Sequence, residues 1–183
     1  KAAFKIGENL ATTPGSVVFR NHMFELIQYA PTTENVLETP LVVFPAWINR
    51  YYILDLGAKK SFVRWAVDQG ITLFMVSWKS AAASMKDVSW ADYIAAQSDA
   101  TDTACRIAGT KSAHTVGYCV AGTTLAAALA LAILTPIASA QQATLVSTIA
   151  GADRPGPWGN SSYDFSLKVS KSVFKTVNLQ RTQ

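Results

Sequence analysis

The stretch GYCVAG, residues 117–122, decides how this chain folds. It follows a β-prone run, residues 114–118, and precedes an apolar run of helical character, residues 122–134. A strand that turns sharply into a helix at a serine or cysteine is a nucleophile elbow, which presents the reactive side chain above the sheet edge. The small residues at positions 117, 121 and 122 permit so tight a turn. The stretch therefore predicts an elbow centred on Cys119.

The chemistry expected at this turn is that of a thiol nucleophile. A helix that begins just after Cys119 favours the thiolate, because its free N–H groups and dipole stabilise negative charge. The backbone N–H of Val120 is then one half of an oxyanion hole. The six residues alone are equally consistent with a buried structural cysteine beside a glycine-rich turn. The position after the third of a series of buried strands favours the nucleophile.

Working outward, β-prone and helical runs alternate along the chain. Residues 15–29 predict a hairpin that turns at Asn21 and His22, and residues 31–40 predict a loop. Further strands are predicted at 41–44, 71–76, 114–118 and 143–149. Helices are predicted at 58–69, between the N-cap Ser89 and the stop at Gly109, and at 122–134. This order is typical of a mostly parallel sheet with right-handed crossover helices. The predicted fold class is α/β.

Four motifs resemble one family in the same order. GYCVAGTT is similar to the lipase-like box of polyhydroxyalkanoate synthases, in which cysteine takes the place of serine. KIGENLATTPGSVVFRN, FPAWINRYYILDL and GITLFMVSWK resemble three further segments of that family. The resemblance covers about residues 4–150, and the single-chain (class I) synthases look nearest.

The resemblance implies a truncated α/β-hydrolase fold and an acyltransferase that polymerises (R)-3-hydroxyacyl-CoA with release of CoA. It implies a covalent thioester on Cys119, no metal or other cofactor, and a cytoplasmic enzyme at the surface of polyester granules, with a homodimer as one option. By match to the family, the Ile48 backbone N–H is the second oxyanion donor. The alternative is an ordinary loop in which Trp47 and Tyr51 pack against the core.

The family supplies a triad aspartate and histidine after the nucleophile, and this chain departs from that pattern. Its two histidines, His22 and His114, both precede Cys119. His114 opens the strand that leads to the elbow, about 15 Å from the nucleophile along five extended residues. Asp153 and Asp164 follow Cys119 but match no triad segment. We therefore expect part of a synthase, with the nucleophile but without the triad aspartate and histidine, inactive by itself.

Two other functions compete with this interpretation. A cysteine esterase or thioesterase of the same fold would lack the NLATTPG and INRYYILDL segments, residues 9–15 and 48–56, so their presence argues against it. A non-catalytic module that binds a granule or partner through exposed apolar surface is favoured by the absent triad. Among other reactive or aromatic residues, we expect a core position for Cys105, and core or interface positions for Trp65, Trp78 and Trp90.

Composition narrows the remaining classes. Half of the 183 residues are apolar, which excludes a disordered chain. The longest apolar run, residues 125–140, contains Thr135 and Pro136 and is shorter than the roughly 20 residues that span a membrane. Two cysteines are too few for a disulfide framework or a metal site, which suggests a reducing compartment. The chain starts at Lys1, so we expect a piece of a longer protein.

Charge divides the chain at residue 153. Residues 1–153 hold as many basic as acidic side chains, whereas residues 154–183 hold five basic residues and one acidic residue, which accounts for the net charge of +4. No nucleic-acid motif accompanies these basic residues. We expect a catalytic-domain part at 1–153 and a poorly ordered basic tail at 154–183.

Limited proteolysis tests this division. Trypsin should cut first at Lys168, Lys171 and Lys175 and leave a resistant core that ends near residue 153. A tail as protected as the helix after Cys119 would show that it belongs to the fold.

Overall fold

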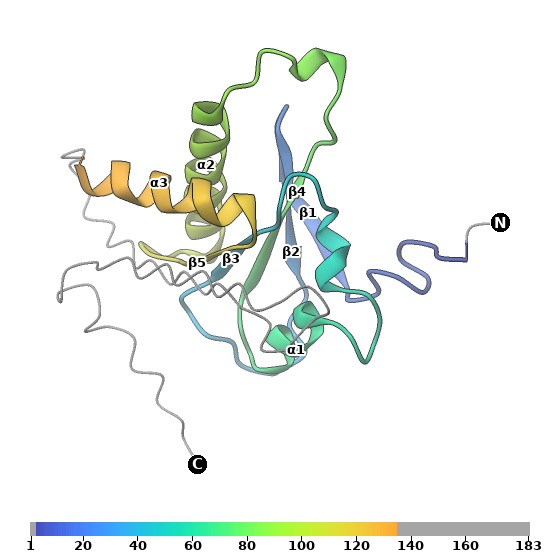
Figure 1. Ribbon diagram of the computed structural model, residues 1–183. Coiled ribbons are helices and arrows are strands. Elements are labelled where there is room, and N and C mark those ends of the chain that lie inside the picture. The colour runs from blue at the N-terminus through green and yellow to red at the C-terminus, as the bar shows by residue number, and fades with distance from the viewer. Residues whose placement is uncertain (1–2, 135–183) are drawn as a thin grey trace, which may run out of the picture. The chain divides into compact units, whose positions relative to one another are not determined.

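A single mixed sheet organises residues 3–134, the part of the chain that the computed structural model describes. Within these residues the strand order is β1 (Gly15–Arg20), β2 (Phe24–Tyr29), β4 (Leu73–Trp78), β3 (Leu41–Phe44) and β5 (His114–Gly117). Helices cover both faces of the sheet (Figure 1). The strand expected at 143–149 and the tail expected at 154–183 lie outside the described residues.

The predicted hairpin is confirmed. Strands β1 (Gly15–Arg20) and β2 (Phe24–Tyr29) pair in antiparallel fashion, with a bulge between Val17 and Phe19. The Asn21 side-chain oxygen accepts hydrogen bonds from the backbone N–H groups of residues 23 and 24, at 2.8 and 2.9 Å. This local bond explains why the chain turns here, and it leaves His22 in the turn as expected.

The three buried strands are parallel, as predicted. Strand β3 (Leu41–Phe44) lies between β4 (Leu73–Trp78) and β5 (His114–Gly117) and is parallel to both. The description "mostly parallel" is too strong, however, because β2 pairs antiparallel with β4, so parallel and antiparallel pairings are equal in number among residues 3–134. Strand β2 is largely buried, so it needs a neighbour on the sheet rather than a free hairpin edge.

The two faces of the sheet carry separate cores. Helices α2 (Trp90–Ala108) and α3 (Val120–Leu134) cover one face, and α1 (Phe62–Asp68) covers the other (Figure 1). Successive β4 side chains point to opposite faces, as the period of two requires. The α2 and α3 core includes Phe44, Phe74, Val76, Ala100, Ala104 and Leu125; the α1 core includes Val43, Leu73, Met75, Val63, Ala66 and Val67.

The helix starts depend on serine caps. Ser89 and Asp92 form a capping box at the start of α2, and these hydrogen bonds lower the pKa of the Asp92 carboxyl. Gly109 ends α2 with φ of 71°. The helix predicted at 58–69 is shorter than expected, because the Ser61 side chain accepts from Arg64 N–H at 2.8 Å and starts α1 at Phe62. A turn occupies residues 57–60 instead.

The other strand and helix limits shift by at most two residues. Strand β4 runs over 73–78 rather than 71–76, β5 ends at 117 rather than 118, and α3 begins at 120 rather than 122. Two short 3₁₀ helices, η1 (Tyr51–Leu54) and η2 (Ala83–Met85), follow β3 and β4 and were not expected. Within residues 3–134, no helix has the length and apolar character needed to cross a membrane.

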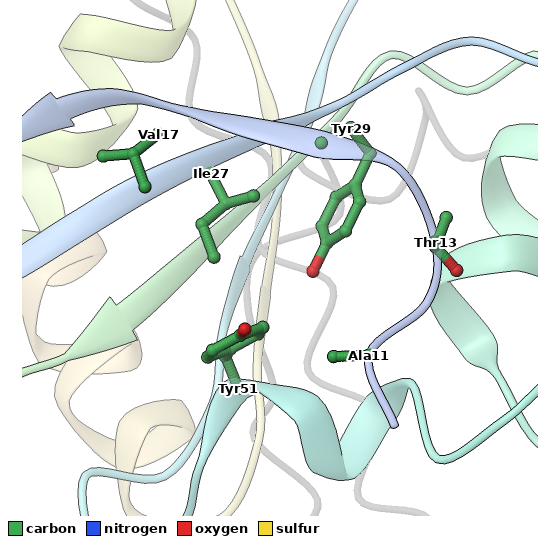
Figure 2. Close-up of a pocket in the computed structure, with 7 residues that line it drawn as sticks. Ala11, Thr13, Val17, Ile27, Tyr29 and Tyr51 are labelled. Atoms are coloured by element: carbon green, nitrogen blue, oxygen red, sulfur yellow. The ribbon is translucent and has the colours of Figure 1, made fainter. Parts of the chain in front are cut away.

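A buried polar group joins the N-terminal segment to the loop after β3. Both oxygens of the Asp55 carboxylate accept hydrogen bonds from Thr13, one from its N–H and one from its hydroxyl, each at 3.0 Å. A small pocket of about 170 Å³ lies next to Thr13 (Figure 2). Tyr29 and Tyr51 also line it, and the buried Tyr29 hydroxyl has no hydrogen-bond partner among the described residues.

The Tyr29 hydroxyl should therefore lower stability. Burial, followed by the Asp55 carboxylate and Tyr51, raises the pKa of Tyr29 above its ordinary value of 10.0. As pH rises above 10, the unfolded chain releases the Tyr29 proton while the folded chain still holds it, so the free energy of unfolding falls. Below pH 10 both states hold the proton, and Tyr29 causes no such loss. Tyr29→Phe should raise the free energy of unfolding by about 1 kcal/mol at neutral pH, and its advantage should grow above pH 10.

Urea titrations at pH 7 and at about pH 10.5 measure this effect. Tyr118→Phe is the matched control, because Tyr118 is 47% exposed and its hydroxyl removal should change little. A Tyr29→Phe variant that is less stable than the wild type would show that the hydroxyl has a partner.

Candidate active site

Cys119 occupies the turn between β5 and α3. Strand β5 ends at Gly117, and α3 begins at Val120, directly after the cysteine. The backbone of Cys119 has φ of 57°, in the left-handed region that non-glycine residues rarely adopt. Such a conformation costs free energy, of order 1–3 kcal/mol, and persists where the surrounding structure fixes it. The predicted tight turn from strand to helix is confirmed.

The contact between Gly117 and Gly122 makes the turn possible. A Cβ atom added to Gly117 would lie 2.5 Å from the Gly122 Cα, far inside van der Waals contact. The Gly122 N–H also donates to the Cys119 carbonyl oxygen at 2.9 Å, which closes the turn. Ala121 is fully buried beneath it. Small residues are therefore required because two backbone segments touch here.

The elbow lies at the carboxyl edge of the parallel strands. Gly117 pairs with Phe44 at the end of β3, and the Tyr118 N–H donates to the Phe44 carbonyl at 2.9 Å. The loop after β3 therefore starts beside the cysteine. This is the edge at which open α/β sheets bind ligands. The Cys119 side chain is exposed there, so a substrate has access to the thiol.

Ile48 lies in this loop, in a turn closed by a hydrogen bond from Asn49 N–H to the Ala46 carbonyl at 3.0 Å. Its side chain is 84% exposed. The backbone N–H of Val120 belongs to the first turn of α3, where helical N–H groups have no acceptor within the helix. Their roles as paired oxyanion donors stay a prediction.

Aromatic side chains fix the loop that carries Ile48. Trp47 stacks on Tyr93 of α2, with ring centroids 3.6 Å apart and an angle of 3° between the planes. The Trp78 indole N–H donates to the Pro45 carbonyl at 2.7 Å. Trp90 meets the edge of Trp47 at 5.3 Å. The rigid platform beside the elbow therefore comes from α2 and β4.

The packing expected for the aromatic residues is largely confirmed. Trp47 packs against the α2 and α3 core, and Tyr51 packs against the α1 core. Trp78 is buried, and Trp90, which is 47% exposed, packs against Trp47. Trp65 is 55% exposed on α1 and contacts Phe62, so it is a surface residue rather than a core residue. Its place on the outer side of α1 explains the difference.

The two cysteines differ as the sequence predicts. Cys105 is buried in α2. Burial raises the pKa of its thiol, the Asp102 carboxylate adds to this, and a hydrogen bond with Thr110 opposes it. Its burial places Cys105 in the core, as expected. A buried thiol of raised pKa also reacts slowly.

The two histidines lie at opposite edges of the sheet formed by residues 3–134. His22 precedes Phe24, which pairs with Trp78 at the carboxyl end of β4, and strands β4 and β3 separate β2 from β5. His114 begins β5 and pairs with Leu41, at the opposite end of the strand from the elbow. His22 lies in the turn between β1 and β2. Residues 3–134 contain no group of three or more His, Cys, Asp or Glu side chains that could hold a metal ion. Asp153 and Asp164 lie outside the described residues.

Sequence reasoning missed two buried polar residues near these elements. Asp55, 1% exposed, fixes the chain after η1 to the N-terminal segment. Gln97, also 1% exposed, donates from its side-chain amide to the Ala121 carbonyl in the first turn of α3 at 2.9 Å. A signal for Gln97 existed, because it is a polar residue within the apolar stripe of a helix. The burial of Asp55 had no such signal.

The sheet, the covering helices and the strained turn define an α/β-hydrolase-type fold with a cysteine at the turn between β5 and α3. Comparison with known proteins specifies the class further. The family described as "Poly-beta-hydroxybutyrate polymerase (PhaC) N-terminus" matches residues 1–66. The chain belongs to the poly(3-hydroxyalkanoate) polymerase family.

Curated relatives support this assignment. A poly(3-hydroxyalkanoate) polymerase of Methylorubrum extorquens is 43% identical over 151 residues, 80% of this chain and 24% of the relative. The polymerase subunit PhaC of Cupriavidus necator is 43% identical over 150 residues, 81% of this chain and 26% of the relative. The polymerase subunit PhaC of Rhizobium etli is 46% identical over 129 residues, which are 70% of this chain and 20% of the relative. The chain spans about a quarter of the length of these relatives.

A solved structure shows a slighter likeness. A lipase-like protein from Sulfolobus solfataricus superposes with a TM-score of 0.40 and 11% identity. The superposition covers 63% of this chain and 44% of that chain.

The glycine contact gives a stability test of the elbow. Gly117→Ala should lower the free energy of unfolding by about 3 kcal/mol, because the new methyl group would force β5 and α3 apart. Gly109→Ala is the control: its φ is positive, at 71°, and an added Cβ meets no atom within 4 Å. Only backbone strain of about 1 kcal/mol is expected there. Equal losses in urea denaturation would contradict the close approach of the two segments.

Proposed function

We propose that Cys119 is the nucleophile of a polyester-forming acyltransferase that takes (R)-3-hydroxyacyl groups from CoA and releases CoA. The observation that carries the proposal is the left-handed backbone of Cys119, which presents an exposed thiol where β5 meets α3. Strain of this kind at an exposed thiol is typical of catalytic turns. The curated relatives are named poly(3-hydroxyalkanoate) polymerases, which supports the substrate class.

The first half-reaction exchanges one thioester for another. The Cys119 thiolate attacks the thioester carbonyl carbon and forms a tetrahedral oxyanion, which the backbone N–H groups of Val120 and Ile48 stabilise. The carbon–sulfur bond to CoA then breaks, and CoA leaves as a thiolate that takes a proton from water. Because a thioester replaces a thioester, the covalent step changes the free energy little.

The second half-reaction needs a group that this chain does not provide after the nucleophile. The hydroxyl of a second acyl unit attacks the Cys119 thioester, and its proton must pass to a general base. No histidine follows Cys119 in the sequence. His114 lies at the opposite end of β5 from the elbow, and strands β4 and β3 separate β5 from β2, which follows His22. The 183-residue chain by itself therefore stops at the acyl-enzyme.

Granule association in the cytoplasm belongs to the same proposal, as does a homodimer. Three large apolar side chains near the elbow are exposed: Ile48 at 84%, and Tyr118 and Trp90 at 47% each. An apolar edge of this kind suits contact with a polyester surface. A non-catalytic granule-binding role would use the same residues without Cys119. A cysteine esterase or thioesterase would hydrolyse the acyl-enzyme. Each alternative therefore predicts a result of the experiment below that differs from that of the acyltransferase.

Mixing the chain with (R)-3-hydroxybutyryl-CoA should label Cys119 once. Intact-mass spectrometry should show one added hydroxybutyryl group, located on the Cys119 peptide, and a single equivalent of CoA released. Cys119→Ala should abolish labelling, whereas Cys105→Ala should not change it, because Cys105 is buried.

Other results would contradict the proposal. No labelling at any substrate concentration would remove Cys119 as the nucleophile and favour the binding module. Release of many equivalents of CoA would show that the chain contains a working base, and continuous release of free hydroxy acid would indicate a thioesterase.

A further inference from the structure

Gln97 connects α2 to the first turn of α3. It is 1% exposed and belongs to the α2 face that covers the sheet, as do the buried Ala100 and Ala104. Its side-chain Nε2 donates to the Ala121 carbonyl at 2.9 Å. The two residues come from different helices, so this bond fixes the position of one helix relative to the other at the elbow.

Packing alone does not explain a glutamine at this position. The Gln97 Oε1 atom is buried and has no hydrogen-bond partner among the described residues. A buried acceptor without a donor destabilises the folded state, whereas an apolar side chain of the same shape would have no such penalty. A methionine would fill the same volume without that loss. The value of the amide at this position therefore lies in the hydrogen bond that its Nε2 donates to the Ala121 carbonyl.

The bond acts on a peptide group that is hydrogen-bonded to the Cys119 carbonyl. The Ala121 carbonyl shares its peptide unit with the Gly122 N–H, which donates to the Cys119 carbonyl at 2.9 Å. Gln97 thus holds one side of this peptide, and Cys119 is bonded to the other side. The Thr124 hydroxyl also donates to the Ala121 carbonyl, at 3.1 Å. Two side chains therefore fix a peptide that adjoins the turn.

The Val120 N–H lies two peptides before this fixed group, and it shares its peptide unit with the Cys119 carbonyl that accepts from the Gly122 N–H. An oxyanion donor is effective only when it is held at the position where negative charge develops, because the gain comes from a dipole that needs no reorientation. Movement of the first turn of α3 would move the Val120 N–H with it. A contact that fixes the first turn of α3 therefore also fixes the position of the proposed oxyanion donor.

We propose that Gln97 is a positioning residue for acyl transfer: through the Ala121–Gly122 peptide, it holds the first turn of α3 so that the Val120 N–H faces the oxyanion. The inference rests on the proposed function of Cys119. It assigns to the buried amide a part in the reaction rather than in stability. The benefit of the Nε2 hydrogen bond then offsets the cost of burying Oε1 without a partner.

The test compares two reactions of the same thiol. Acylation by (R)-3-hydroxybutyryl-CoA forms an oxyanion, whereas alkylation by iodoacetamide displaces iodide and forms none. Gln97→Met should lower the acylation rate of Cys119 about tenfold, less than the loss of a whole oxyanion donor. It should leave the alkylation rate within about twofold, because the thiol keeps its exposure. Both rates are measured by mass spectrometry of the Cys119 peptide.

Two further variants control the comparison. Thr101→Val removes a hydrogen bond of similar length on the same helix, the 2.9 Å bond to the Gln97 carbonyl, and it should leave the ratio of the two rates unchanged. Thr124→Val removes the other side-chain donor to the Ala121 carbonyl and should lower the ratio in the same direction. It also supplies the test if Gln97→Met does not fold.

The outcomes separate this inference from the proposal beneath it. A wild-type chain that is alkylated but never acylated at Cys119 would overturn the proposed function, and this inference with it. A wild-type chain that is acylated, with variants of Gln97 and Thr124 that have the same ratio of rates, would overturn only the role of Gln97. A parallel loss of both rates would show that Gln97 is merely structural.

Discussion

The contact between Gly117 and Gly122 is the constraint on which the rest of the elbow depends. The backbone of β5 and the backbone of α3 touch there, so no side chain larger than hydrogen fits on Gly117. This contact lets the helix start directly after Cys119 and keeps the cysteine in a left-handed conformation. The free energy that the strained residue costs is offset by the packing of α3 on the sheet, where Ala121 and Leu125 are buried. The geometry of the turn and the packing of the core thus depend on the same contacts.

A second level of organisation surrounds the elbow. The parallel pairing of β3 with β5 brings the loop after β3 next to Cys119, and the stacked Trp47 and Tyr93 fix that loop against α2. The same helix supplies Gln97 to the first turn of α3. Helix α2 therefore contacts the neighbours of both candidate oxyanion donors, although none of its residues belongs to the four motifs quoted above. This explains how a helix remote in sequence from the nucleophile affects the site.

Local patterns were good predictors of the elements but poor predictors of their limits. Apolar runs and the cap at Ser89 located each strand and α-helix of residues 3–134, but not the two 3₁₀ helices, because burial and capping are read from a few neighbouring residues. The start of α1 was missed by four residues, since Ser61 rather than the apolar run decides where the helix begins. The antiparallel pairing of β2 with β4 was missed for a different reason. Residues 24–29 and 73–78 are far apart in the chain, and no local pattern records which strand becomes a neighbour.

The sequence by itself determined the elbow, the family and the identity of the reactive cysteine as a proposal, because GYCVAG between a strand and a helix has few other structural solutions. It also separated Cys119 from Cys105, since one follows a strand and the other lies on the apolar stripe of a helix. Only the tertiary structure decided how the buried polar side chains of Gln97 and Asp55 are paired. The bond from Gln97 to Ala121 joins residues 24 positions apart, and that from Thr13 to Asp55 joins residues 42 positions apart. Such bonds form only when the sheet brings distant segments together, and composition and periodicity contain no record of that distance.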